Sequence, residues 1–318
     1  VEKETGFRPS LFIFSSSWLD SIFHMRAWIK STWFWLGIVA LFFIAVGVYV
    51  ISMLGRPPAF PTKYELYPGV TYHRVVRYFP HAMIAHVVVI DRKEAKASFL
   101  VTPPDQVEGG TVKARTTSEF LKEFGVQIAI NGDGFSPWWS RSPVDYYPHQ
   151  GDPVTPLGFA AAFGKIYSDG LQQPTQEPTL YISRRNELSF NRAPGKLQHA
   201  ISGDRMLLLS GEVVPDLDDT TLQPRTAIGT NRNGRYVILV VVDGRQPFYS
   251  TGATFKELAE LMKAYDAFFA MALDGGGSST LVVQKKNGGT QILNSPIDNY
   301  IPGRERPVAN HIGVSIAP

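Results

Sequence analysis

The sequence AMALDGGGSSTLVV at residues 270–283 indicates where the fold of this chain is centred. An apolar run with strand character ends at Asp274, three glycines and two serines follow, and a second apolar run begins after Thr280. The glycines lack a Cβ atom, so the backbone can adopt positive φ angles and approach a ligand closely. Consecutive N–H groups in such a turn form a concave site for an anion. A glycine-rich hairpin without chemistry is the alternative, but the flanking Asp274 and residues 278–280 favour a binding turn.

Short apolar runs dominate the chain around this stretch. Helix signals are fewer: residues 117–124 follow a threonine cap, and residues 254–265 open with Thr254 and have Glu257 three positions later, as in a capping box. The pattern predicts an α+β domain with a mixed, multi-stranded sheet and few helices. The expected strands, several of them buried on both faces, are residues 85–90, 97–101, 126–130, 206–209, 236–242 and 268–273.

Composition excludes several classes of protein. With 318 residues, 44% of them hydrophobic and 19% charged, the chain can bury one large core or two small ones. The formal net charge of +3 is small and the basic residues are scattered, which argues against a nucleic-acid partner. Cysteine is absent, which excludes disulfides, cysteine nucleophiles and thiolate metal sites.

An uncharged stretch at residues 33–54 is long enough to cross a hydrocarbon core of roughly 30 Å. We interpret it as a transmembrane helix. A buried core helix would have a polar face, and a cleaved signal peptide would have a shorter apolar region followed by a small-residue cleavage site. More basic residues precede the span than follow it closely, so we expect a cytoplasmic N-terminus and a C-terminal domain outside the cytoplasm. These residues are Lys3, Arg8, Arg26 and Lys30 before the span, and Arg56 and Lys63 after it.

The predicted organisation has four parts. Residues 1–32 form a cytoplasmic or interfacial segment, residues 33–54 the transmembrane helix, residues 55–65 a proline-rich linker, and residues 66–318 the globular domain. Within the first part, the aromatic-rich residues 11–29 are too interrupted to span a bilayer. They are suited to the membrane interface or to contact with another membrane protein, so partners are expected along residues 11–54 as well as the lipid itself.

Polar residues follow three of the predicted buried strands. Asn131 and Asp133 follow residues 126–130, Asp243 follows residues 236–242, and Asp274 follows residues 268–273. Each turn alone has an ordinary loop composition, but the threefold recurrence favours a shared site at one edge of the sheet. The side chains expected to converge in one pocket are Asp133, Arg225, Asp243, Asp274 and Arg306.

Seven motifs follow one another along the chain: NGDGF at 131–135, RTAIG at 225–229, VVDGR at 241–245, TFKELAELM at 254–262, ALDGGGSSTLVV at 272–283, NSPID at 294–298 and ERPVANHIGV at 305–314. Their order is the one seen in the phosphodiester glycosidase family, which residues 85–318 resemble, and the combination of DGGGSST with ERPVAN is specific. Asp133 departs from the common family form NGGFF, where glycine is usual. Residues 137–156 look peculiar to a subgroup, so the substrate pocket can differ.

The resemblance implies cleavage of a sugar C1–oxygen bond with a phosphate monoester as the leaving group. Such a leaving group is already a stable anion, so general-acid help matters less and positive donors around the phosphate matter more. It implies that the catalytic carboxylate is Asp274 as first choice, Asp243 as second and Glu305 as third. The phosphate would be bound by Arg225, Arg245 and Arg306 together with the turn Gly275, Gly276, Gly277, Ser278 and Ser279. The sugar would be bound by Asn131, Asp133 and Asn310.

Alternatives stay open for several of these residues. Arg225 can pair with a surface carboxylate, and Glu305 with Arg306 can form a simple ion pair on a turn. The resemblance places His311 near the site, where a structural role is favoured over a catalytic one. No cofactor is expected, although three aspartates at strand ends also suit a hard cation such as calcium.

Two functions of different classes follow. The first is a membrane-anchored, outward-facing hydrolase that cleaves a sugar-1-phosphodiester, similar to an N-acetylglucosamine-1-phosphodiester, in an envelope glycan or exopolysaccharide. The second is a non-catalytic binding or structural subunit of a membrane assembly that retains the fold. Convergence of Arg225, Asp243, Asp274 and Arg306 on one cleft would favour the first.

Overall fold

The structure is a computed structural model that describes residues 17–169 and 177–317. The chain divides into two units, Val1–Leu54 and Gly55–Pro318, and each is described by itself. Of the aromatic-rich segment expected at residues 11–29, residues 11–16 lie outside the described residues.

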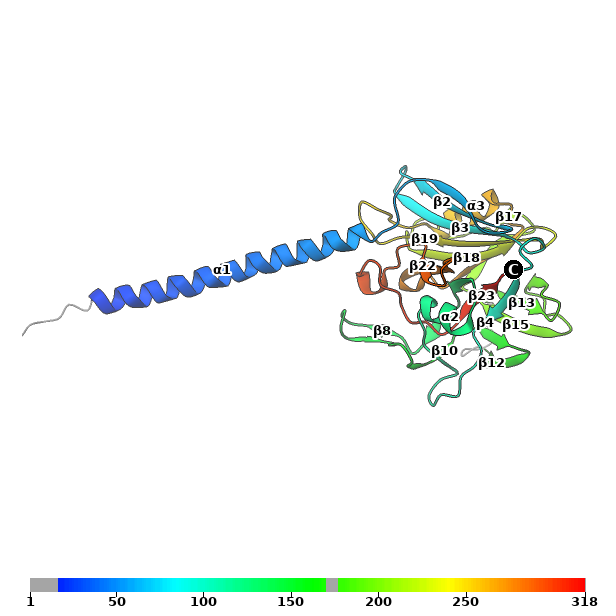
Figure 1. The fold of residues 1–318 in the computed structure, drawn as a ribbon, viewed down its shortest axis with the longest axis horizontal. Coiled ribbons are helices and arrows are strands. Elements are labelled where there is room, and N and C mark those ends of the chain that lie inside the picture. The colour runs from blue at the N-terminus through cyan, green and yellow to red at the C-terminus, as the bar shows by residue number, and fades with distance from the viewer. Residues whose placement is uncertain (1–16, 170–176, 318) are drawn as a thin grey trace, which may run out of the picture. The chain divides into compact units, whose positions relative to one another are not determined.

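The N-terminal unit contains one long helix, α1 (Ser17–Leu54) (Figure 1). Its part Ser31–Leu54 has 24 residues with a mean hydropathy of 2.6, which is long and apolar enough to cross a membrane. The helix begins at Ser17 rather than at Trp33, because neither glycine nor proline interrupts residues 17–33. The predicted apolar helix is thus confirmed, without a boundary at residue 33.

The second unit is strand-rich, and its largest element is an eight-stranded sheet (Figure 1). Each neighbouring pair in this sheet is antiparallel. In spatial order the strands are β1 (Thr62–Tyr67), β2 (Val70–Arg77), β3 (Met83–Asp91), β19 (Tyr236–Val242), β18 (Arg225–Thr230), β20 (Phe269–Leu273), β16 (Arg205–Leu209) and β17 (Glu212–Val213).

Two five-stranded sheets and two small ones complete the domain. The first comprises β22 (Thr290–Ile292), β21 (Leu281–Gln284), β6 (Ile128–Asn131), β23 (His311–Ser315) and β4 (Ser98–Val101). The second comprises β12 (Lys165–Asp169), β11 (Phe159–Ala162), β15 (Leu197–Ser202), β13 (Thr179–Ser183) and β14 (Leu188–Phe190). The small sheets are β5 (Val112–Lys113) with β10 (Pro153–Pro156) and β7 (Phe135–Ser136), and the hairpin β8 (Trp139–Ser140) with β9 (Tyr146–Tyr147).

Both faces of the central strands β18, β19 and β20 are buried. Alternate residues of β19 enter two cores: Leu239 packs with side chains of both five-stranded sheets, and Val240 packs under the helix α3 (Phe255–Ala264). The helix α2 (Thr117–Phe124) packs on β6 and β21. Both helices begin with the predicted threonine cap, and each cap is a complete capping box. The α+β class and the predicted strands are therefore confirmed.

Two details differ from the prediction. The described strand ladders are antiparallel rather than mixed. Continuous apolar runs are typical of parallel sheets, but here they occur because a helix and other sheets cover both faces of the central strands. In addition, residues 55–65 are not a free linker. Pro57 O accepts a hydrogen bond from Tyr249 Oη at 3.0 Å, Ala59 O accepts one from Tyr78 Oη at 2.7 Å, and β1 begins at Thr62.

The order of three central strands brings several predicted site residues to one edge of the large sheet. Because β18 is antiparallel to both β19 and β20, the latter two run in the same direction and end at the same edge. Arg225, which begins β18, pairs with Val242, and Thr226 pairs with Leu273. Asp243 and Asp274, the next residues after β19 and β20, therefore both leave the sheet at the edge where Arg225 enters it.

A buried polar cluster ties this edge to the C-terminal segment. Asp243 Oδ2 lies 2.9 Å from His86 Nε2, and His86 Nδ1 lies 2.8 Å from Tyr72 Oη. The other oxygen, Asp243 Oδ1, accepts hydrogen bonds from Ser295 N at 2.7 Å and Asn294 Nδ2 at 3.2 Å. The side chains of His86 and Asp243 have no exposed surface. The cluster joins β2, β3 and β19 to residues 294–295, and each of its members depends on the others because unpaired polar groups are costly when buried.

We predict that Asp243→Ala lowers the free energy of unfolding by about 3 kcal/mol, because His86 and the Ser295 N–H then lose a buried partner. Chemical denaturation of the full chain in detergent, followed by tryptophan fluorescence, measures the change. Asp274→Asn is the matched control, since Asp274 is only half-buried, and it should change stability by less than about 1 kcal/mol. Equal, small effects of both substitutions would show that the cluster does not hold this edge together.

Candidate active site

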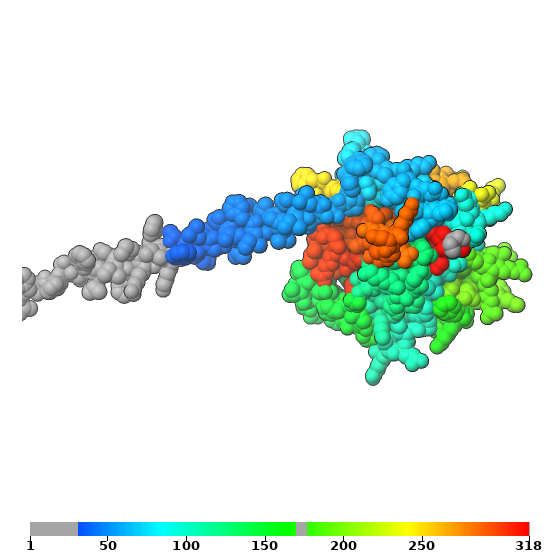
Figure 2. All heavy atoms as spheres, viewed as in Figure 1, coloured from blue at the N-terminus to red at the C-terminus, as the bar shows by residue number. Residues whose placement is uncertain are grey.

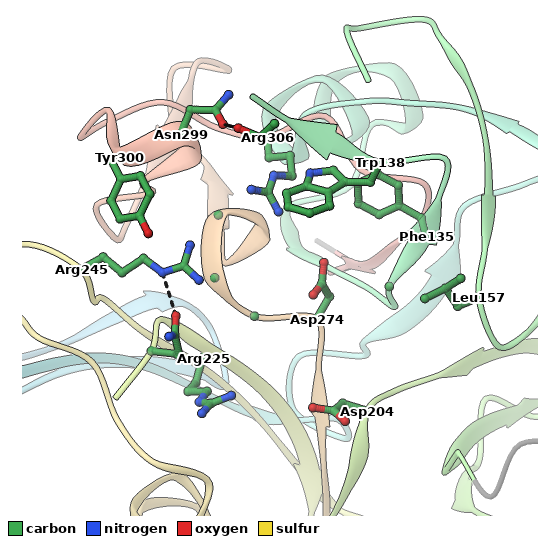
Figure 3. A pocket seen from close by; sticks show the side chains of 16 residues that line it. Phe135, Trp138, Leu157, Asp204, Arg225, Arg245, Asp274, Asn299, Tyr300 and Arg306 are labelled. Carbon is green, nitrogen blue, oxygen red and sulfur yellow. Dashed lines mark hydrogen bonds between the residues drawn. The ribbon is translucent and has the colours of Figure 1, made fainter. Parts of the chain in front are cut away.

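A cavity of about 550 Å³ opens at the edge of the sheet where Arg225 and Asp274 lie (Figure 3). Its lining includes one of the predicted carboxylates and all three predicted arginines, brought together from distant parts of the chain. These residues are Asp274, Arg225, Arg245 and Arg306. The volume lies in the range of small-molecule sites, and the lining carries an excess of positive charge even with Asp204 included.

Asp274 provides the carboxylate that points into the cavity (Figure 3). Its backbone is fixed, since its N–H donates to Gly132 O at 2.9 Å and its carbonyl accepts from Asn131 Nδ2 at 2.8 Å. Burial raises the pKa of Asp274, while a hydrogen bond from Ser278 and the charge of Arg306 oppose that rise. The result is a carboxylate held in a poorly hydrated place with a cation beside it, a setting that suits a base or nucleophile.

The glycines after Asp274 are needed for the close approach of two arginines. They form the short helical turn η1 (Gly276–Ser278), in which Gly276 has φ 61°. A Cβ atom at Gly276 would lie 3.0 Å from Arg245 Nη2, and one at Gly277 would lie 2.5 Å from Arg306 Nη2. The N–H of Gly276 already donates to Pro224 O at 2.9 Å, so the turn differs from the predicted N–H nest: it presents two guanidinium groups.

Both of these arginines are held through their Nε atoms. Arg245 Nε donates to Gln223 Oε1 at 2.7 Å, and Arg306 Nε donates to Asp298 Oδ1 at 2.7 Å. Tyr300 lies 5.7 Å from the guanidinium of Arg245, measured to the ring centroid. Fixing the Nε edge orients the terminal nitrogens, which is the edge a guanidinium uses for bidentate binding of an oxyanion.

Arg225 forms part of the cavity wall and is more constrained. Its Nε donates to Ala253 O and its Nη2 to Thr221 O, both at 3.0 Å, and its guanidinium lies 3.7 Å from the centroid of the Phe255 ring. Burial lowers the pKa of Arg225 to about 10, so it remains charged at neutral pH. Two backbone carbonyls therefore take up part of its hydrogen-bonding capacity before any ligand binds.

The residues predicted to bind sugar lie beneath the cavity and do not line it. Asn131 is fully buried and its Oδ1 accepts from Thr280 N at 3.1 Å, while Asn310 Oδ1 accepts from Asp133 N at 2.8 Å. Asp133 accepts backbone N–H bonds at both oxygens, and burial raises its pKa to about 7. The physical reason is that these side chains satisfy backbone N–H groups of neighbouring turns.

Asp243, Glu305 and Ser279 also lie outside the lining of the cavity. Asp243 is enclosed in the buried cluster with His86, so its oxygens are not available to a ligand. Glu305 Oε2 accepts from Ser118 N at 3.0 Å at the start of α2, where it satisfies a free helix N–H, and burial raises its pKa. Ser279 is buried, and neither it nor Ser278 lines the cavity. Ser278 still lies beside it, with its Oγ 3.5 Å from Arg306 Nη1.

His311 has a structural role, as favoured from the sequence. It is fully buried, its ring stacks on Phe120 at 4.7 Å between centroids, and burial lowers its pKa to about 3. Within residues 17–169 and 177–317, no group of three or more histidine, aspartate or glutamate side chains is arranged to hold a metal ion. The three strand-end aspartates considered for calcium therefore do not form one set of ligands for an ion.

The sequence prediction missed several lining residues. Asp204 follows β15, and its N–H donates to Ala272 O at 2.9 Å. The sequence contained an indication of Asp204, because Gly203 and Asp204 come directly after a strand, as do the polar residues and glycines of the other turns. A Cβ atom at Gly203 would lie 2.3 Å from Ala272 O, so glycine is required there. Trp138 and Tyr300 were also missed, because they belong to loops without a regular pattern.

Comparison with solved structures finds the same fold in several proteins. A zebrafish N-acetylglucosamine-1-phosphodiester α-N-acetylglucosaminidase catalytic domain, auto-inhibited by its pro-peptide, has a TM-score of 0.56 at 19% identity over 84% of this chain and 93% of its own. A hypothetical protein from Synechocystis has a TM-score of 0.54 at 14% identity over 83% of this chain; this chain spans only 64% of its length. A Burkholderia pseudomallei K96243 protein described as exported has a TM-score of 0.52 at 16% identity, over 77% of this chain and 76% of its own.

At sequence level, no curated protein matches the chain. The model of the phosphodiester glycosidase family, in contrast, matches residues 124–315. This match covers more than half of the chain and contains Asp274 with all three cavity arginines. The chain belongs to the phosphodiester glycosidase family.

Proposed function

We propose that this protein is a membrane-anchored hydrolase whose globular domain lies outside the cytoplasm and cleaves a sugar-1-phosphodiester in an envelope glycan or exopolysaccharide. The observation that carries the proposal is the convergence of Asp274 with Arg225, Arg245 and Arg306 on one cavity. The name of the zebrafish neighbour adds support for an N-acetylglucosamine-1-phosphodiester as the kind of substrate. A purely structural subunit would not need a half-buried carboxylate beside free guanidinium edges.

The phosphate of the substrate would bind at the glycine turn. Arg245 and Arg306 flank Gly276 and Gly277 with their Nε atoms already bonded to the protein, so their terminal nitrogens are the donors for the phosphate oxygens. A phosphodiester carries one negative charge, and the cleaved monoester carries more. The arginines therefore stabilise the leaving group increasingly as the bond breaks, which is the condition for catalysis rather than mere binding.

Asp274 would act on the sugar side of the same bond. The oxygen of water forms a bond to C1 while the bond from C1 to the phosphate oxygen breaks, and the proton of the water passes to Asp274. The products are the free sugar and a phosphate monoester. Asp204 adds a second negative charge to the cavity, which stabilises the positive charge that develops on the sugar ring. Direct attack of Asp274 on C1, followed by hydrolysis, uses the same residues.

We predict that Asp274→Asn lowers the turnover of a sugar-1-phosphodiester by about 100-fold or more, equivalent to roughly 3 kcal/mol of barrier, while the fold is kept. Release of free sugar from UDP-N-acetylglucosamine or a simple α-sugar-1-phosphodiester measures it, with EDTA in parallel to test a divalent cation. Since burial raises the pKa of Asp274, the wild-type rate should fall on acidification at a higher pH than an ordinary aspartate would give. A folded wild-type protein inactive on a broad panel of diesters would contradict the hydrolase proposal.

Arg306→Lys should raise the KM for a phosphodiester about tenfold, because lysine keeps the charge but loses both the fork and the bond to Asp298. Gly277→Ala should have a similar effect, since its Cβ would lie 2.5 Å from Arg306 Nη2 and displace the guanidinium. Gly195→Ala is the control, as a Cβ there meets nothing within 4 Å. If Gly277→Ala leaves KM and kcat unchanged, the turn does not position the phosphate site.

The proposed topology can be tested on cells. Residues 1–32 would be cytoplasmic or interfacial, and the domain from about residue 66 would lie outside, anchored by α1. Protease added to intact cells, after any outer barrier has been permeabilised, should remove the domain and leave the anchor. Full protection of the domain under these conditions would reverse the assigned orientation.

A further inference from the structure

Large apolar side chains are exposed around the mouth of the cavity. They come from three segments: the β8–β9 hairpin, the loop after β19, and the residues around the short helix η2 (Asp298–Tyr300). We call this set the apolar rim. Its members, with their exposed fractions, are Trp138 (48%), Trp139 (39%), Val144 (89%), Phe248 (96%), Tyr300 (75%) and Ile301 (38%). In Figure 2 the green hairpin and the red η2 segment lie together on one face of the domain.

The rim segments are connected to one another by specific contacts. Arg304 Nη1 donates to Pro143 O at 3.2 Å, which joins the η2 segment to the hairpin. Gln246 and Ser295 exchange hydrogen bonds of 2.8 and 2.9 Å, which join the loop after β19 to the same C-terminal segment. The three segments of the apolar rim are therefore held together, and Trp138 and Tyr300 also line the cavity.

The backbone of the rim is strained where it exposes apolar side chains. Phe248 has φ 61° and Tyr300 has φ 60°, a left-handed conformation that bulky residues rarely adopt. Such strain concentrates at functional positions. Phe248 and Ile301 do not line the cavity, so a ligand held wholly within it would leave them in water. Their exposure calls for a second apolar environment next to the cavity mouth.

The covalent chain indicates what that environment is. Tyr249, next to Phe248, donates a hydrogen bond from Oη to Pro57 O at 3.0 Å, and the guanidinium of Arg56 lies 5.4 Å from the centroid of the Tyr249 ring. Helix α1 ends at Leu54, and three residues of chain span at most about 11 Å. The loop that carries both Phe248 and the cavity residue Arg245 is thus hydrogen-bonded to Pro57, which follows the last residue of the apolar helix by three positions in the chain.

We propose that the apolar rim contacts the bilayer in which α1 is anchored, and that the cavity takes a sugar-1-phosphodiester whose second ester is to a membrane lipid. This rests on the hydrolase activity of the proposed function, and it replaces the envelope polymer by a membrane lipid as the carrier of the sugar phosphate. Tyrosine and tryptophan are the side chains typical of a membrane interface. Val144, Phe248 and Ile301 have no polar side-chain atom, which suits lipid chains better than the sugars of a polymer. Water would add to C1, the C1–oxygen bond would break, free sugar would leave, and the lipid phosphate monoester would stay in the bilayer.

The test uses the full chain in phosphatidylcholine vesicles and two substrates with the same N-acetylglucosamine-1-phosphate head. One is esterified to a hexadecyl chain in the vesicle, and the other is the soluble methyl diester. The double variant Phe248→Ser with Ile301→Ser should lower kcat/KM for the hexadecyl diester at least tenfold and leave the methyl diester within about twofold. Phe163→Ser is the matched control, since Phe163 is also an exposed phenylalanine with positive φ, at 61% and 52°, and should change neither.

The outcomes separate this proposal from the proposed function. Suppose that the wild-type protein cleaves the methyl diester. If the rim variant then has wild-type kcat/KM for both diesters, or loses kcat/KM equally for both, the lipid proposal is wrong and the hydrolase proposal stands. The same holds if the rim variant instead loses association with another membrane protein while cleaving both diesters normally. If wild type cleaves neither diester, the hydrolase proposal fails and the lipid proposal with it.

Discussion

Two guanidinium groups pack against the backbone of Gly276 and Gly277, directly after the carboxylate of Asp274, and the cavity depends on this contact. It requires residues without Cβ, because a methyl group at Gly277 would lie 2.5 Å from Arg306 Nη2. The same contact places positive charge beside a carboxylate whose pKa is raised by burial. The glycine turn thus decides at once where an anion can bind and how readily Asp274 stays ionised.

Behind the cavity lies a layer of buried polar side chains that hold the turns in place. Asn131 bonds to the carbonyl of Asp274, Asn310 bonds to the N–H of Asp133, and Asp243 joins β3 to the segment 294–295. Asparagine and aspartate are residue types that often bind ligands, but the hydrogen-bonding groups of these residues contact the protein itself. They support the geometry of Asp274 and the arginines, and a polar layer of this kind is stable only while each member keeps its partners.

The sequence predicted those features that follow from local chemistry. The apolar runs predicted the strands, the spacing of Thr254 and Glu257 predicted a capping box, and the glycines after Asp274 predicted a turn that lines the cavity. It did not predict which polar side chain in a turn faces the cavity, because Asp243 and Asp274 occupy equivalent positions after parallel-running strands. Only tertiary neighbours, such as His86 for Asp243, distinguish them. Nor did it predict the rim, since its loops have no periodic pattern.

We propose that the protein breaks the bond between the sugar C1 and the phosphate oxygen. Hydrolysis in ¹⁸O-labelled water, with mass spectrometry of both products, tests this most directly. The arrangement of Asp274 and the arginines predicts that the label enters the C1 hydroxyl of the released sugar and that the phosphate monoester stays unlabelled. Label in the phosphate would mean cleavage of the phosphorus–oxygen bond, and would contradict the account.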